Sequence, residues 1–166
     1  NGVWGQTDQP LFYSPLKPHA GTKIFRCPGD KSTVKYQTKP MDVPDAEWQL
    51  VVLQRPRSYS INIFVGGWSG WPFMEDTQYK IYHEYQEVRD PSRIFTFIEM
   101  PKNSINAGNF RVPPVLKGKK SAFSMDWPGV YHNNGSVVSF IDSHVEFKRW
   151  LEEDTKNIPE HLQNPT

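Results

Sequence analysis

The clearest alternation of apolar and polar residues lies near the C-terminal end of the chain, in residues 136–148. It resembles two antiparallel strands joined by the two-residue turn Asp142-Ser143, with Ile141 paired to His144. In that register one face of the hairpin is wholly apolar, and the other mixes apolar and polar residues. The apolar face consists of Val138, Phe140, Val145 and Phe147. We therefore expect a half-buried hairpin with these four side chains on the core.

Other segments have the composition of strands. Residues 59–65 alternate apolar and polar side chains up to a Gly-Gly pair, which predicts a strand. Residues 94–98 are apolar on both faces and predict a central strand. Residues 48–53 fit a strand or a buried helical turn, and residues 77–88 fit a short helix or, less well, a strand. Shorter strand candidates are residues 23–25 and 122–125.

The intervening segments are rich in polar residues, Pro and Gly. We expect an irregular lead-in over residues 1–22, loops over 31–47 and 99–120, and a C-terminal tail over 151–166 that begins with one helical turn. With 15 Pro and 11 Gly, long helices are improbable. The sequence thus predicts one α+β domain over residues 1–166, an antiparallel sheet with long Pro-rich loops and little helix.

Charge and cysteine content exclude several classes of protein. The 19 basic and 18 acidic side chains give a net charge of +1 without long runs of one sign, so we expect no nucleic-acid partner. The single cysteine, Cys27, excludes an internal disulfide and a zinc site of several thiolates. No apolar stretch approaches the roughly 18 residues that a membrane-spanning helix needs.

Four short motifs, in a shared order along most of the chain, carry a family resemblance. The fourth motif is a His that is followed, after nine residues, by an Asp, one further residue, His-Val and, shortly after, a Trp. The residue after the Asp is Gly in the family pattern and Ser143 in this chain. The motifs are Phe25-Arg26-Cys27-Pro28-Gly29-Asp30, then Ser58-Tyr59-Ser60-Ile61-Asn62, then Pro91-Ser92 before an apolar strand, and His132 with Asp142, His144, Val145 and Trp150. Together they resemble bacterial prepilin-type proteins, relatives of the type II secretion pseudopilins.

The resemblance implies a structural role rather than catalysis. It implies the head of a precursor that is anchored in the membrane by an N-terminal helix missing from this chain. That helix would later pack into a pilus-like filament with other pilin or pseudopilin subunits. Heads would lie in the cell envelope, on its periplasmic or extracellular side, where they could contact secreted cargo. It also leaves open a disulfide between Cys27 and a cysteine of the missing helix.

Several residues belong to types that can bind metals or cap turns. His132, Asp142 and His144 are metal-ligand types, but an extended strand between them would hold His132 about 20 Å or more from the other two, so we expect no shared ion. Asp30 and Asp142 are expected to accept backbone hydrogen bonds in turns, and His132 to anchor a loop. We expect no cofactor.

Three further readings stay open. Cys27 could be a nucleophile paired with a histidine or simply a buried thiol. Trp68 and Trp71, on a Gly-rich loop, could stack on sugar rings, which would make the chain a carbohydrate-binding module, or could cover a small core. The carboxylates of Glu84, Glu99 and Asp126 would be needed for a glycosidase, but the sequence does not fix their separation.

Overall fold

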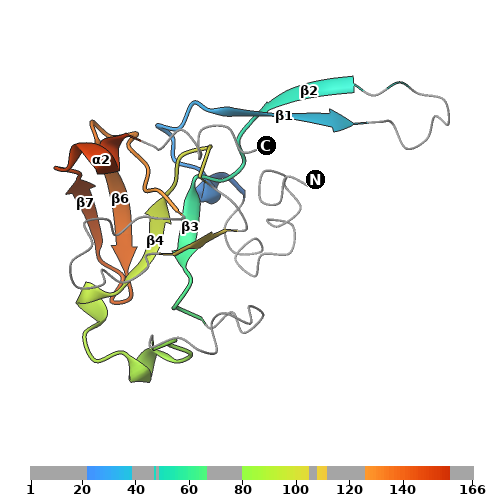
Figure 1. The fold of residues 1–166 in the computed structure, drawn as a ribbon. Helices are drawn as coiled ribbons and strands as arrows, with labels where there is room; N and C mark the ends of the chain where they lie inside the picture. Colours follow the sequence, from blue (N-terminus) through green and yellow to red (C-terminus); the bar gives the residue numbers. More distant parts are fainter. Residues whose placement is uncertain are drawn as a thin grey trace.

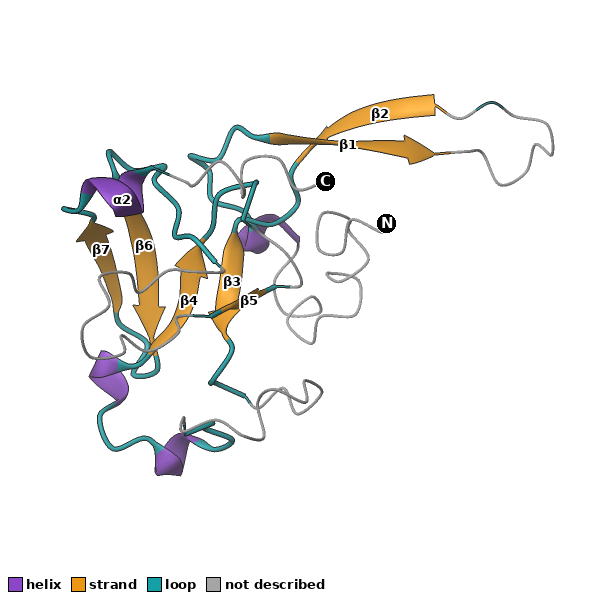
Figure 2. Ribbon diagram, viewed as in Figure 1, coloured by secondary structure: helices purple, strands orange, loops and turns teal. Residues whose placement is uncertain are grey.

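Two β-sheets dominate the described part of the chain, a five-stranded sheet and a two-stranded ribbon that projects from it (Figures 1 and 2). The structure is a computed structural model. It describes residues 22–38, 47, 49–66, 80–104, 108–111 and 126–157. In these residues no helix is long and apolar enough to cross a membrane.

The large sheet is mixed, with mostly antiparallel pairs, in the order β5-β3-β4-β6-β7. Only β5 runs parallel to its neighbour, β3. The strands are β3 (Tyr59–Asn62), β4 (Phe95–Glu99), β5 (Asn109–Phe110), β6 (Gly135–Phe140) and β7 (Val145–Arg149). The ribbon pairs β1 (Thr33–Thr38) with β2 (Gln49–Gln54). The helices are short: η1 (Thr22–Phe25), η2 (Tyr85–Glu87), η3 (Pro91–Arg93) and α2 (Glu153–Lys156).

The core lies on one face of the large sheet. Ile98, Met100, Phe110 and Val138 are buried there, with Phe95, Phe140 and Trp150 packed around them. The rings of Phe95 and Phe110 meet edge to face, with centroids 5.9 Å apart, a favoured aromatic geometry. Large rings therefore supply much of this core.

The hairpin of β6 and β7 exists, but its predicted register is wrong. Val138 pairs with Glu146 and Val137 with Phe147, one residue away from the predicted pairing. The loop has three residues rather than two, because the Phe140 amide donates to the His144 carbonyl and Ser143 has φ 76°. A left-handed third loop residue is usual in three-residue hairpin loops.

This shift moves half of the predicted apolar face to the other side of the sheet. Val145 and Phe147 are 61% and 53% exposed, whereas Val138 is 4% exposed. On the core face Phe140 instead lies opposite His144, whose ring stacks on it with centroids 4.2 Å apart.

Several other predictions are confirmed. Residues 94–98 predicted a central strand, and β4 lies between β3 and β6. Residues 48–53 predicted a strand or a helical turn, and β2 shows the strand. The strand predicted over 59–65 forms but ends at Asn62, since the Asn62 side-chain oxygen accepts from the Phe64 amide at 3.0 Å and turns the backbone.

Other predictions are wrong. Residues 23–25 lie in the 3₁₀-helix η1 and not in a strand, with their backbone held by a local turn. The loops expected over 31–47 and 99–120 contain β1 and β5, which form because each meets a partner strand. By contrast, the helical turn expected at the start of the C-terminal tail is confirmed, since α2 lies there. Of the segment 77–88, residues 80–88 are described, and they contain a short helix, the 3₁₀-helix η2. The lead-in predicted over 1–22, apart from Thr22 in η1, the strand candidate 122–125 and the end of the tail lie outside the described residues.

Candidate functional site

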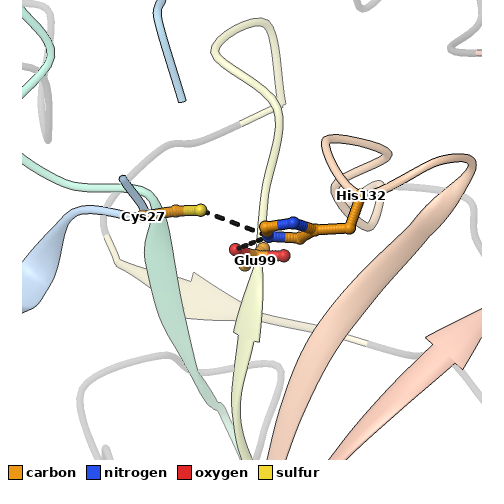
Figure 3. Close-up of side chains that lie close together, drawn as sticks. All are labelled: Cys27, Glu99 and His132. Atoms are coloured by element: carbon orange, nitrogen blue, oxygen red, sulfur yellow. Dashed lines mark hydrogen bonds and ion pairs between the residues drawn. The ribbon is translucent and has the colours of Figure 1, made fainter. Parts of the chain in front are cut away.

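Three side chains from separate parts of the chain meet at the C-terminal end of β4. Cys27 comes from the turn after η1, Glu99 is the last residue of β4, and His132 comes from the turn before β6 (Figure 3). The Cys27 Sγ atom lies 3.2 Å from His132 Nε2, and this same nitrogen lies 3.0 Å from Glu99 Oε1. All three atoms are within 4.8 Å of one another.

The Cys27 side chain is held by a tight turn. The Asp30 amide donates to the Cys27 carbonyl at 3.0 Å, and the Gly29 amide donates to Cys27 Sγ at 3.2 Å. A Cβ atom at Gly29 would lie 3.3 Å from the His132 ring and 3.4 Å from Sγ. The absence of a side chain at Gly29 therefore lets the thiol and the imidazole approach each other.

Asp30 fixes this turn to the rest of the molecule. As predicted, its carboxylate accepts a backbone bond, from the Ser32 amide at 2.9 Å. It also pairs with Arg55, and both side chains are completely buried. Burial alone would raise the pKa of Asp30, but hydrogen bonds from Ser32 and Ser58 and the charge of Arg55 hold that pKa below its usual value.

Glu99 is fully buried and is oriented by the start of β6. Its Oε2 atom accepts from the Val137 amide at 2.9 Å and lies 3.4 Å from the Ser136 hydroxyl. Its Oε1 atom thereby faces His132. Within the described residues, the ion pairs include no Lys or Arg partner for this carboxylate.

His132 opens the cluster to solvent. Its side chain is 35% exposed, whereas that of Glu99 is 0% exposed. The following residues, Asn133 and Asn134, have φ of 50° and 61°, a left-handed conformation that asparagine tolerates better than most residues. This turn returns the chain into β6, with the His132 amide donating to the Gly135 carbonyl at 3.3 Å.

The surroundings favour protonated, neutral forms of two neighbouring groups. Burial raises the pKa of the Cys27 thiol, and a hydrogen bond with Glu99 raises it further. Burial, followed by the negative charges of Glu99 and Cys27, also raises the pKa of Tyr59. An uncomplexed Cys27 is therefore a thiol at neutral pH and a poor nucleophile.

The geometry also differs from that of a catalytic triad. In a triad the nucleophile and the acid contact opposite nitrogens of the imidazole, so that one nitrogen accepts the proton of the nucleophile while the acid orients the ring through the other. Here Cys27 and Glu99 contact the same nitrogen of His132. The arrangement does not support the nucleophile reading, and three donor atoms instead converge on one region.

The structure brings together some of the predicted site residues. Cys27 and His132 meet, and Tyr59 is their neighbour through its interactions with Cys27 and Glu99. His132 anchors its loop by a side-chain hydrogen bond, as expected. Asn62 lies elsewhere, at the end of β3, where its side chain donates to the Phe95 carbonyl at 2.9 Å.

The other half of the last motif lies at the opposite end of β6. Asp142 and Ser143 lie in the hairpin loop and His144 follows it directly, so all three are separated from His132 by the full length of β6, as expected from the extended strand. Asp142 accepts from the His144 amide at 3.2 Å, which confirms its predicted role in the turn. Trp68 and Trp71 fall outside the described residues.

The sequence did not point to Glu99 as a partner of Cys27 and His132, because this carboxylate was considered only as one of a possible pair of glycosidase acids. A usable signal exists in the sequence. Glu99 directly follows an apolar run and precedes Met100, and this placement would have put its carboxylate at the buried end of a central strand instead of in the loop expected over 99–120. A buried carboxylate requires polar partners, and here these come from distant residues.

Comparison of the chain with protein-family models, curated proteins and solved structures finds no match.

Proposed function

We propose that this chain is the head of a prepilin-like assembly subunit of a type II secretion or type IV pilus-like filament. Its partners are then other pilin or pseudopilin subunits, and secreted cargo is a further partner class. The proposal places the protein in the cell envelope, with the head on the periplasmic or extracellular side. It assigns the chain no catalytic activity.

The observation that carries the proposal is an apolar stripe on the sheet face opposite the core. Phe97 is paired with Ser139, which is paired with Val145, so Phe97 and Val145 share one face across three neighbouring strands. Phe147 lies on the same face, two residues along β7. These three side chains are 39%, 61% and 53% exposed.

Such a stripe suits a sheet that packs against an apolar partner. Exposed apolar side chains that gather on one face, rather than being scattered, are typical of an interaction surface. Covering them contributes about 25 cal/mol for each Å² removed from water. In the family that the chain resembles, the head rests its sheet on the anchoring helix, and the stripe formed by Phe97, Val145 and Phe147 supplies a face for it.

The spatial meeting of separate motifs gives further support. The motif around Cys27, the motif around Tyr59 and the His132 end of the last motif come together at one end of the sheet. Motifs that hold a head together need such contacts, whereas unrelated chance matches would be scattered over the fold.

The proposal is tested by introducing a charge into the stripe of the full-length precursor in its native cells. We expect Phe147→Asp to prevent incorporation into sheared filament or pseudopilus fractions, because a buried, unpaired carboxylate would replace an apolar contact. Leu151→Asp is the matched control, since Leu151 is 76% exposed and follows the last strand. Incorporation is measured by immunoblotting, and thermal melting of both purified variants checks their folding.

Equal incorporation of both variants would contradict the role of the stripe. A gene that encodes no apolar helical segment upstream of this sequence would contradict the prepilin reading itself.

A further inference from the structure

We propose that Cys27, Glu99 and His132 bind one divalent transition-metal ion of the zinc class through Sγ, Oε1 and Nε2. This inference is independent of the assembly role proposed above. It concerns a site at one end of the sheet, and its ligands come from three separate segments.

The chemistry of the three donors is that of zinc. Thiolate sulfur, imidazole nitrogen and carboxylate oxygen are its usual protein ligands, and three such ligands leave a fourth tetrahedral position for water. One thiolate and one carboxylate also balance the charge of a divalent ion. This explains how a fully buried carboxylate can be kept in the described structure without a Lys or Arg partner.

The distances between the donor atoms are close to those that a zinc site requires. Zinc bonds of about 2.3 Å to sulfur and about 2.0–2.1 Å to nitrogen and oxygen place tetrahedral neighbours roughly 3.3–3.6 Å apart. The Sγ···Nε2 and Nε2···Oε1 distances are 3.2 and 3.0 Å. These two distances are a few tenths of an ångström shorter than a tetrahedral zinc site requires, and Sγ and the Glu99 carboxylate lie within 4.8 Å of each other.

The convergence on one nitrogen distinguishes a metal site from a relay of protons. Cys27 and Glu99 both approach His132 Nε2, so the three donor atoms surround one region (Figure 3). Metal binding would replace these two hydrogen bonds by three bonds to a shared cation.

Neighbouring backbone groups already orient the ligands. The Gly29 amide points at Sγ, and the Val137 amide holds the other carboxylate oxygen, Oε2, at 2.9 Å. Supporting hydrogen bonds of this kind are typical of metal centres and tune their affinity. The partly exposed side of His132 gives an ion access from solvent.

A disulfide is a less suitable use of the same cysteine. Cys27 is 1% exposed and its sulfur contacts both His132 and the Gly29 amide. A second cysteine could reach this sulfur only after the cluster had been displaced.

The test is titration of the purified, chelator-treated chain with Zn²⁺ and with Co²⁺. We expect one equivalent of metal per chain by elemental analysis. With Co²⁺ we expect a thiolate-to-cobalt charge-transfer band together with the d–d absorption of four-coordinate cobalt. Because Cys27 is the only cysteine, that band can arise from no other residue of the chain.

Variants identify the remaining ligands. Cys27→Ser should abolish the charge-transfer band, and His132→Gln and Glu99→Gln should each weaken binding at least tenfold. The matched control is His144→Gln, which removes another part-exposed histidine that contacts a carboxylate, at the far end of β6. Its affinity and spectrum should equal those of the native chain.

Three results would overturn the proposal. These are a native chain that binds less than one equivalent, a cobalt complex without the thiolate band, and Cys27 recovered in a disulfide. An equal loss of metal affinity in His144→Gln and His132→Gln would also overturn it. Since the cobalt spectrum is recorded on the native chain, the test holds even if a variant fails to fold.

Discussion

Replacing Arg55 by methionine should strongly destabilise the fold, because it would leave the buried carboxylate of Asp30 without its counter-ion. The Arg55 side chain is 0% exposed, and its Nε and Nη2 atoms donate to one oxygen of Asp30 at 2.9 and 2.5 Å. Nη2 also donates to the Met100 carbonyl at 2.8 Å and to the Tyr131 hydroxyl at 3.0 Å. The pair therefore joins the Cys27 turn to the end of β4.

The magnitude follows from what remains after the substitution. Breaking a buried ion pair on one side costs about 3–5 kcal/mol. Asp30 would keep its bonds from the Ser32 amide, the Ser32 hydroxyl and the Ser58 hydroxyl, so we expect about 3 kcal/mol. This is a large part of the roughly 5–15 kcal/mol by which domains are usually stable.

The double variant, Arg55→Met with Asp30→Asn, should recover part of the loss, because no buried charge then remains. Arg55 Nη1 is itself buried without a hydrogen-bond partner among the described residues, so removing the guanidinium also removes a cost. We expect a coupling free energy of about 2 kcal/mol between the two sites. Urea unfolding at pH 7, followed by tryptophan fluorescence, measures all four forms.

A loss below about 1 kcal/mol for Arg55→Met would refute this reasoning, and so would a coupling free energy near zero. Either result would mean that water reaches the pair in solution.

Three further predictions concern turns, packing and pH. Ser143→Gly should raise the free energy of unfolding by up to about 1 kcal/mol, since Ser143 has φ 76°, and an unchanged melting temperature would contradict this. Gly135→Ala should destabilise by about 1–3 kcal/mol, because its Cβ would lie 2.4 Å from the Phe147 ring and 2.6 Å from the Lys148 carbonyl, as calorimetry can check. Because the pKa of Asp30 is lowered in the folded protein, its ionised carboxylate should contribute fully to the free energy of unfolding above the unfolded pKa of about 3.9. That contribution should be lost as pH falls through the folded pKa, and Asp30→Asn should flatten this acid dependence in urea titrations.

The sequence predicted elements whose signal is local. The apolar run of β4 indicated a central strand, and the turn residues around Asp142 indicated a hairpin. The register was missed because a two-residue loop and a three-residue loop fit the same sequence, and both can place Ser143 at positive φ. The hydrogen bond from the Phe140 amide to the His144 carbonyl identifies the three-residue loop. One residue of difference then exchanged the faces of Val145 and Phe147.

Elements that depend on a distant partner could not be predicted in this way. β1 is short and has few apolar residues, a composition that predicts part of a loop, and it forms against β2. The site has the same difficulty, since Cys27 is separated by 105 residues from His132, and His132 by 33 residues from Glu99. The sequence supplied the residue types, but their meeting follows from the order of strands in the sheet.

The two proposals meet on β4, and this allows a test of their relation. Phe97 and Glu99 are two residues apart in one regular stretch of strand, so they share the sheet face that carries the apolar stripe. An ion held by Glu99 would tie that end of the face to the Cys27 turn and to His132.

If assembly needs the bound ion, Cys27→Ser in the full-length precursor should reduce incorporation into filaments. Added Zn²⁺ should not restore incorporation, because the variant lacks the thiolate ligand. Phe147→Asp should abolish incorporation while the purified head still binds one equivalent of metal, because Phe147 lies on β7 and supplies no ligand. Filament fractions and metal content are measured on the same variants. Normal incorporation of Cys27→Ser would separate the metal site from assembly, and loss of metal in Phe147→Asp would show that the stripe and the site are one structural unit.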